Sequence, residues 1–125
     1  MFELGQYSDV AYLFLRLSVA AIFIYHAVLK LKDSEGMSRM MGMPAGMILM
    51  LGFVEVAVSL GLTFGVYLQI AALLAVVVML GALYFKIIKW HVPFGAMDKT
   101  GWELDLILLA ASVFLLVQGG GALTI

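Results

Sequence analysis

The chain has 125 residues, of which 65% are hydrophobic and only 12% are charged. A soluble domain carries about 25% charged residues and about 45–50% apolar residues, so this composition predicts an integral membrane protein. The sequence contains no cysteine, which excludes disulfide exchange, thiolate nucleophiles, cysteine-ligated iron–sulfur clusters and covalent haem attachment within the chain. The net charge of −1 and the scattered Lys and Arg residues provide no basic patch for nucleic acid.

Four apolar stretches predict four membrane-spanning helices, over residues 10–31, 44–63, 67–90 and 102–118. Residues 32–43 are polar and rich in methionine, which predicts an interfacial turn or a short amphipathic helix. Thr100 and Glu103 have the spacing of a capping box at the start of the last helix. The sequence therefore predicts an all-α, integral membrane four-helix bundle that forms a single transmembrane domain over residues 1–125.

The distribution of positive charge predicts how the bundle is oriented. Four spans place both termini and the second loop on one side of the membrane, and the first and third loops on the other. Six of the seven Lys and Arg residues lie in or beside the first and third loops: Lys30, Lys32, Arg39, Lys86, Lys89 and Lys99. Because cytoplasmic loops carry an excess of Lys and Arg, we expect these two loops in the cytoplasm and both termini outside.

Glu55 is the one charged residue in the stretch from residue 40 to residue 85. An ionised side chain at the centre of a spanning helix costs about 2.5–3.5 kcal/mol, so such a group is usually paired, neutralised or functional. Arg16 is the basic residue within another predicted span. At 1.5 Å per residue, both residues are expected about 10 Å deep in the outer half of the membrane, so the sequence predicts an Arg16–Glu55 pair.

This predicted pair has two interpretations that the sequence leaves open. It is either a structural ion pair that fixes the packing of the first two spans, or the polar wall of a pocket that binds a polar head group or relays a proton. Tyr12 lies one helical turn before Arg16, and Ser59 lies one turn after Glu55, so both residues are expected to extend the same network. No residue is assigned a catalytic role.

A second group of polar residues is expected at the inner side of the membrane. It consists of His26, Lys30, His91, Glu103 and Asp105. Lys30 suits an interfacial anchor, Glu103 suits a helix cap, and Asp105 is expected to pair with Lys30, Lys86 or Lys89. Two histidines without a further placed ligand are a weak metal signal, so no metal site is predicted.

The methionines of the first loop suggest one more possibility. Six methionines lie between residues 37 and 50, and thioethers are soft ligands that suit Cu(I). Methionine is also flexible core filler and partner-binding surface. The sequence therefore leaves a copper or small-solute transporter as a minor alternative, with Met37, Met40, Met41, Met43 and His26 as its expected ligands.

Several short segments, in this order and spacing, resemble the DoxX family over nearly the whole chain. They are Arg16-Leu17, the segment His26-Ala-Val-Leu-Lys-Leu31, Gly42-Met-Pro44, Glu55, Gly101-Trp102-Glu103, and Gly119-Gly-Gly121 after a Leu-rich helix. The polar positions of that family fall on Arg16, Lys30, Glu55 and Glu103. The resemblance implies a small four-helix protein of a bacterial or archaeal cytoplasmic membrane.

The resemblance also implies a function, because members of the family look like membrane components of oxidoreductase systems with quinone as acceptor. We therefore expect a small subunit that is not catalytic alone, carries no cofactor of its own and supports quinone binding or docks a catalytic partner. Its expected partners are membrane lipid and a larger protein complex or further copies of the chain. The alternative is a structural or assembly protein in which the Arg–Glu pair serves packing only.

Overall fold

The computed structural model describes residues 4–91, 94–95 and 101–119, and these residues contain helices and no strand. The helices are a short 3₁₀ turn at Gly5–Tyr7, α1 at Ser8–Lys32, α2 at Ser34–Met41, α3 at Ala45–Phe64, α4 at Leu68–Tyr84, a π-helical turn η2 at Phe85–Lys89, and α5 at Trp102–Gln118. The all-α prediction is confirmed. The described residues form five α-helices and not four, because the segment after α1 forms the short helix α2.

Local sequence explains where the helices around α2 begin and end. The Asp33 carboxylate accepts a hydrogen bond from the backbone N–H of Gly36 at 3.1 Å, which caps the start of α2. Gly42 follows α2 with a φ of 72°, and Gly65 follows α3 with the same φ. Glycine adopts this left-handed conformation without steric cost, so both helices end there. Pro44 immediately precedes α3 and fits the start of a helix.

Three helices are long and apolar enough to cross a membrane. They lie at Gly5–Lys32, Ala45–Phe64 and Leu68–Lys89 of the described chain. The fourth predicted span corresponds to α5, whose 17 residues make it shorter than these three. Many of the large apolar side chains on the outer faces of the helices are exposed, as expected where lipid takes the place of water. The chain is therefore a membrane protein built on apolar helices.

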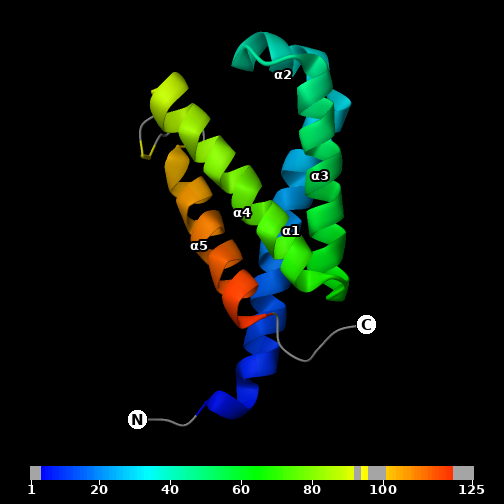
Figure 1. Ribbon diagram of the computed structural model, residues 1–125, viewed down its shortest axis with the longest axis vertical. Helices are drawn as coiled ribbons and strands as arrows, with labels where there is room; N and C mark the ends of the chain where they lie inside the picture. Colours follow the sequence, from blue (N-terminus) through cyan, green and yellow to red (C-terminus); the bar gives the residue numbers. More distant parts are fainter. Residues whose placement is uncertain (1–3, 92–93, 96–100, 120–125) are drawn as a thin grey trace.

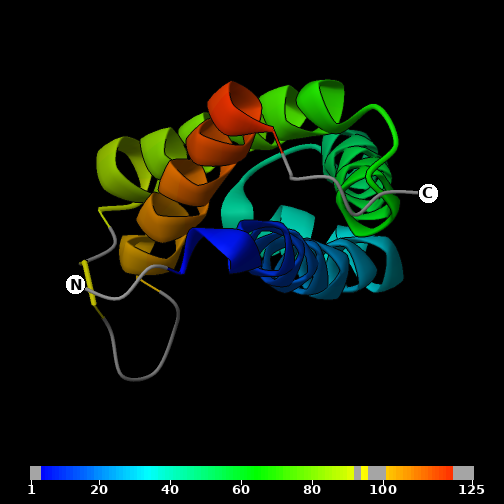
Figure 2. The same cartoon turned by 90° about the horizontal axis from the view of Figure 1, so that it is seen from below.

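The long helices pack as two antiparallel pairs (Figure 1). Helix α1 lies along α3, α4 lies along α5, and the short turn after Gly65 joins the pairs. We call α1 with α3 the first hairpin, and α4 with α5 the second hairpin. The hairpins are close together at this turn and separate toward the end that carries α2, as Figure 1 shows and Figure 2 shows from below.

The core lies where the two hairpins meet. Val58 and Leu62 of α3, Ala72 and Ala75 of α4, and Leu115 of α5 are completely buried there. Small residues let the backbones of α3 and α4 approach closely, and the position of a Cβ built on Gly61 is only 2.9 Å from Cβ of Ala71. The dense packing is thus concentrated at one end, and the helices leave space between them at the other.

The start of α5 differs in detail from the sequence prediction. The helix begins at Trp102, with Gly101 at the N-cap and no side-chain capping bond. The Glu103 side chain is exposed, and its backbone N–H donates to the carbonyl oxygen of Phe94 at 3.0 Å. Thr100, the other half of the predicted capping box, lies outside the described residues.

Candidate functional site

Arg16 does not pair with Glu55, so that prediction is wrong. The Arg16 side chain is fully buried, and its Nε donates to the carbonyl oxygen of Leu62 at 2.9 Å. Its Nη2 donates to the carbonyl oxygen of Thr63 at 3.3 Å. The last carbonyls of a helix have no partner within the helix and carry partial negative charge, so the guanidinium serves as a cap for the end of α3.

The register between α1 and α3 explains the difference. Helix α1 has 25 residues and α3 has 20, and the extra turns of α1 project beyond the end of α3 (Figure 1). Arg16 is therefore level with the last turn of α3 and not with its middle. Ser59 confirms this register, because its hydroxyl donates to the carbonyl oxygen of Ala20 at 3.1 Å.

Glu55 instead pairs with Lys30, near the other end of α1. The Lys30 ammonium lies 2.9 Å from Oε2 of Glu55 and 3.1 Å from Oε1. The exposed fraction is 3% for the carboxylate side chain and 15% for the lysine. This ion pair joins the two helices of the first hairpin at a buried site, where each charge depends on the other for its stability.

A second ion pair joins the two helices of the second hairpin. Nζ of Lys86 lies 2.7 Å from Oδ2 of Asp105, at the start of α5. Lys86 was one of three lysines expected to pair with this carboxylate. It lies in the π-helical turn η2, which changes the direction of side chains relative to an α-helix, and such turns are frequent at functional sites.

Both ion pairs line one cavity of about 340 Å³ between the hairpins, at the end that carries α2. Most of its wall is apolar, with contributions from Phe23 of α1, Leu51 of α3 and Leu108 of α5. Phe85 and Trp90 add an aromatic wall, and their ring centroids lie 5.5 Å apart. The cavity thus combines apolar walls with a few convergent polar groups, which is the usual composition of a small-molecule site.

His26 is the fifth polar residue of the cavity, half-buried on α1 one turn before Lys30. The charges of Lys30, Lys86 and Asp105 all act on its imidazole, so the two ion pairs and the histidine form one electrostatic cluster. The two carboxylates have unused acceptor capacity. Oε2 of Glu55 and Oδ2 of Asp105 lie close to their lysines, but neither atom accepts a hydrogen bond of regular geometry from the described residues.

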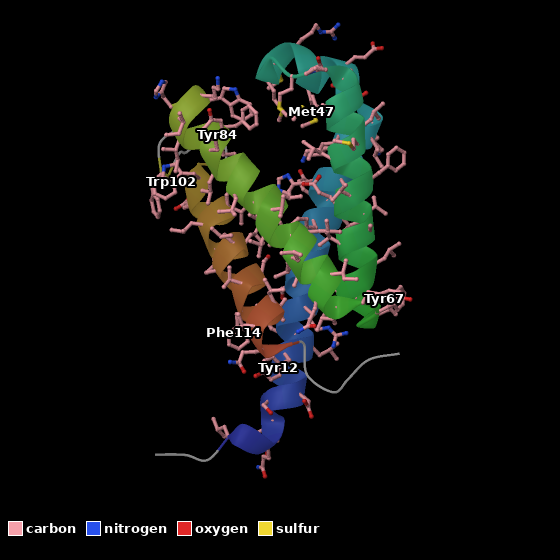
Figure 3. All side chains as sticks on the ribbon, viewed as in Figure 1. Tyr12, Met47, Tyr67, Tyr84, Trp102 and Phe114 are labelled. Carbon is pink, nitrogen blue, oxygen red and sulfur yellow. The ribbon has the colours of Figure 1, made fainter. Side chains whose placement is uncertain are left out.

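The remaining residues of the two predicted groups do not line this cavity. Tyr12 stacks on Phe114 with ring centroids 5.7 Å apart, at the opposite end of the molecule from Met47 (Figure 3). Ser59 bonds to α1, as described above, and does not extend the Glu55 network. His91 is exposed with a φ of 52°, so neither it nor the exposed Glu103 joins His26.

The methionines gather differently from the predicted copper set. Met37, Met41, Met43 and Met47 line the cavity, whereas Met40 is 86% exposed and does not. Within the described ranges, no group of three or more His, Cys, Asp or Glu residues has the arrangement of a metal site. Met37, Met41, Met43 and Met47 therefore add thioether side chains to the wall of the cavity near α2.

Several residues of the cavity are not identifiable from the sequence pattern. The sequence predicts Lys86 as one of three partners for Asp105, and it predicts no role for Phe85. The available signal is the basic and aromatic composition of residues 85–90, which is equally typical of the interfacial end of a helix. A π-helical turn has no simple sequence pattern, so the inward direction of these side chains was not predictable.

Comparison with known proteins identifies the family. The DoxX family model matches residues 11–87, which include Lys30, Glu55 and Lys86 of the cavity. No curated protein and no solved structure matches the chain. The matched region extends over more than half of the sequence, from α1 into the π-helical turn, and the chain belongs to the DoxX family.

Proposed function

We propose that this chain is a quinone-binding subunit of a membrane oxidoreductase complex, and that the quinone head group occupies the cavity between the two hairpins. The observation that carries this proposal is the composition of the cavity, in which two buried ion pairs and His26 are set into apolar and aromatic walls. The chain itself supplies binding and orientation, and the redox chemistry belongs to the bound quinone and to a partner.

The polar groups suit both redox forms of such a head group. The ammonium groups of Lys30 and Lys86 are donors for the carbonyl oxygens of a quinone. The carboxylates of Glu55 and Asp105 have acceptor capacity for the hydroxyl groups of a quinol. The aromatic wall of Phe85 and Trp90 supports a flat ring.

The membrane arrangement that we propose follows from the charges and the helix lengths. α5 acts as a fourth span beside the three longer helices, which completes the four-helix bundle. The loops that carry most of the Lys and Arg residues lie in the cytoplasm of a bacterial or archaeal cell, with both termini outside. The cavity then lies near the cytoplasmic surface, where a soluble catalytic partner would dock.

The test of quinone binding uses the fluorescence of Trp90, which lines the cavity. The chain has two tryptophans, so Trp102→Phe leaves Trp90 as the single reporter. In lipid nanodiscs, a short-chain ubiquinone should quench this fluorescence saturably. Lys86→Gln should weaken binding at least about tenfold, because a hydrogen bond to a charged group contributes about 1.5–3 kcal/mol and 1.4 kcal/mol is tenfold.

Lys89→Gln is the matched control, since Lys89 is an exposed lysine of the same turn that does not line the cavity. It should change the affinity by less than about twofold, which is below 0.5 kcal/mol. If no quinone produces saturable quenching in a protein with native helix content, quinone binding is disproved.

The association with an oxidoreductase has a separate test. The protein is extracted from its native membrane in mild detergent, and its co-purifying polypeptides, bound organic molecules and visible spectrum are recorded. A stoichiometric partner that contains flavin, haem or molybdenum supports the subunit role. A colourless protein that purifies alone or only with itself contradicts that role and favours the structural alternative.

A Cu(I) site is a second candidate, favoured by one observation. Four methionines and His26 line the same cavity, and thioether and imidazole groups are ligands that suit copper. Copper retained after purification, and lost when Met37 and Met41 are both replaced by Leu, would support this function. Quinone binding that is unaffected by the same two replacements would favour the first proposal.

A further inference from the structure

The cavity has a mouth that can be located from its exposed lining residues. Three of the residues that line the cavity are exposed: Met47 of α3, and Val77 and Gly81 of α4. The lining residues of α1, α2 and α5 are buried or only partly exposed. The mouth therefore lies between α3 and α4, where these two helices separate toward the end that carries α2 (Figure 1).

The α4 side of this mouth lies well inside a helix that is long and apolar enough to cross a membrane. Counting back from Lys89 at about 1.5 Å per residue, Gly81 lies about 12 Å and Val77 about 18 Å along the helix from the charged end. Both belong to the candidate span Leu68–Lys89. Leu73 and Leu80 are exposed on the same helix, so the surface around the mouth is of the kind that faces lipid chains.

The size of the cavity limits what part of a ligand it encloses. Its volume of about 340 Å³ is at the lower end of the range of about 300–1,000 Å³ for ligand pockets. A polar head group fits such a space, whereas a long hydrocarbon or isoprenoid chain must lie elsewhere. The bilayer beyond the mouth is the environment in which an apolar chain is stable.

We infer that the cavity takes its ligand laterally from the bilayer, through the mouth between α3 and α4, and that the ligand is a long-chain amphiphile with a hydrogen-bonding head group. The head group reaches Lys30 and Lys86, and the chain passes Gly81 into the surrounding lipid. This inference rests on the proposed function and adds the class of ligand and its route.

Gly81 provides a selective way to obstruct the mouth. A Cβ built at Gly81 has no described heavy atom within 4 Å, so an added side chain starts in open space. Gly46, on α3, is the matched control, because it is also exposed and open but does not line the cavity. Glycine has a lower helix propensity than leucine, so the variants Gly81→Leu and Gly46→Leu should both fold.

The experiment measures quenching of Trp90 in nanodiscs by two probes, a ubiquinone with a decyl chain and the same head group without a chain. Gly81→Leu should slow the association of the decyl quinone and weaken its binding by at least fivefold, with less than a twofold effect on the chainless probe. Gly46→Leu should affect neither probe. Binding of the decyl quinone that is unchanged by Gly81→Leu would overturn the lateral route and leave the proposed function intact.

A second measurement tests the mouth without any quinone. The chain contains no cysteine, so Val77→Cys provides a single thiol at the mouth. This thiol should react with a lipid-soluble maleimide and remain unreactive toward a membrane-impermeant one. Rapid reaction with the impermeant reagent would show a water-filled mouth and overturn the inference, whatever the outcome for quinone binding.

Discussion

Lys30 and Glu55 form the most deeply buried ion pair in the described part of the chain. The charge of each residue lowers the free-energy cost of burying the charge of the other. The carboxylate is almost entirely removed from solvent, and the lysine contacts both of its oxygens. A buried charge without its partner is expensive, whereas a buried pair replaced by apolar groups of similar volume is often tolerated. The packing role and the binding role of the pair therefore predict different results when one or both residues are replaced.

The first prediction compares a single with a double substitution. Glu55→Leu should destabilise the protein by about 3–5 kcal/mol, because it leaves the Lys30 ammonium buried without a counter-charge. Lys30→Met combined with Glu55→Leu should recover most of that stability. The measurement is thermal unfolding in detergent, followed by circular dichroism.

The double variant also separates the two interpretations of the pair. If the pair contributes to a quinone site, the stable double variant should lose quenching of Trp90 by quinone. A double variant that is stable and binds quinone with the affinity of the original chain would show that the pair serves packing only. A double variant no more stable than Glu55→Leu would contradict the expected compensation.

At the scale of single residues, the sequence correctly indicates which buried charge needs a partner, but it does not identify that partner. The isolated position of Glu55 correctly indicated that its charge must be paired or functional. Arg16 is the wrong partner because equal depth from the outer ends of two spans implies equal height only if those ends are level, and α1 extends beyond α3 there. Helical spacing identifies neighbours on one helix, but it does not give the register between two helices.

At the scale of the helices, the close contact between α3 and α4 depends on Gly61, which has no side chain. A Cβ at Gly61 would lie 2.9 Å from Cβ of Ala71 and 3.1 Å from the carbonyl oxygen of Val66. Neither neighbour is the end of a flexible side chain, so the helices themselves would have to move apart. The crossing of α3 and α4 holds the two hairpins together at this end, opposite the cavity.

The second prediction is that Gly61→Ala destabilises the protein. The added methyl group should cost about 1–3 kcal/mol, as overpacking in a well-packed core generally does. Gly81→Ala is the control, because the same change on α4 meets open space and should be neutral or slightly stabilising. Equal unfolding temperatures for these two variants in detergent would contradict the close approach at Gly61.

The helices themselves were largely predictable, since glycine, proline and long apolar runs mark their ends. The observed bounds of α1, α3, α4 with η2, and α5 lie within two residues of the predicted ranges. The π-helical turn was not predictable, because it has the same composition as an interfacial end of an α-helix. This turn carries Lys86 to Asp105, which is one of the three pairings that the sequence predicts for this carboxylate. The pattern does not indicate that Glu55 joins the same group.

At the scale of the whole molecule, the two ion pairs lie within the hairpins and not between them. Lys30–Glu55 joins α1 to α3, and Lys86–Asp105 joins η2 to α5. Neither pair joins one hairpin to the other, so a change in the width of the cavity would not require either ion pair to break. The sequence indicated which residues are polar, but the separation of the hairpins is a tertiary property that no helical pattern encodes.

The third prediction concerns the side of the membrane on which this cavity lies, which decides where a partner docks. Met40 on α2 is 86% exposed, and Tyr67 in the turn after α3 is 77% exposed, so each position accepts a reporter thiol. Figure 3 shows Tyr67 at the end opposite Met47, which lies near α2. The single variants Met40→Cys and Tyr67→Cys therefore report on opposite ends of the bundle in a chain without other cysteines.

A membrane-impermeant maleimide should label Tyr67→Cys in intact cells whose outer surface is accessible, and Met40→Cys only in inverted membrane vesicles. This result is expected because the Lys and Arg residues cluster at the α2 end, and such loops are retained in the cytoplasm. In that orientation, the polar cluster would face the cytoplasm, and the mouth past Gly81 would face the inner leaflet. The reverse labelling pattern would contradict the orientation and place any partner of the cavity on the outer surface.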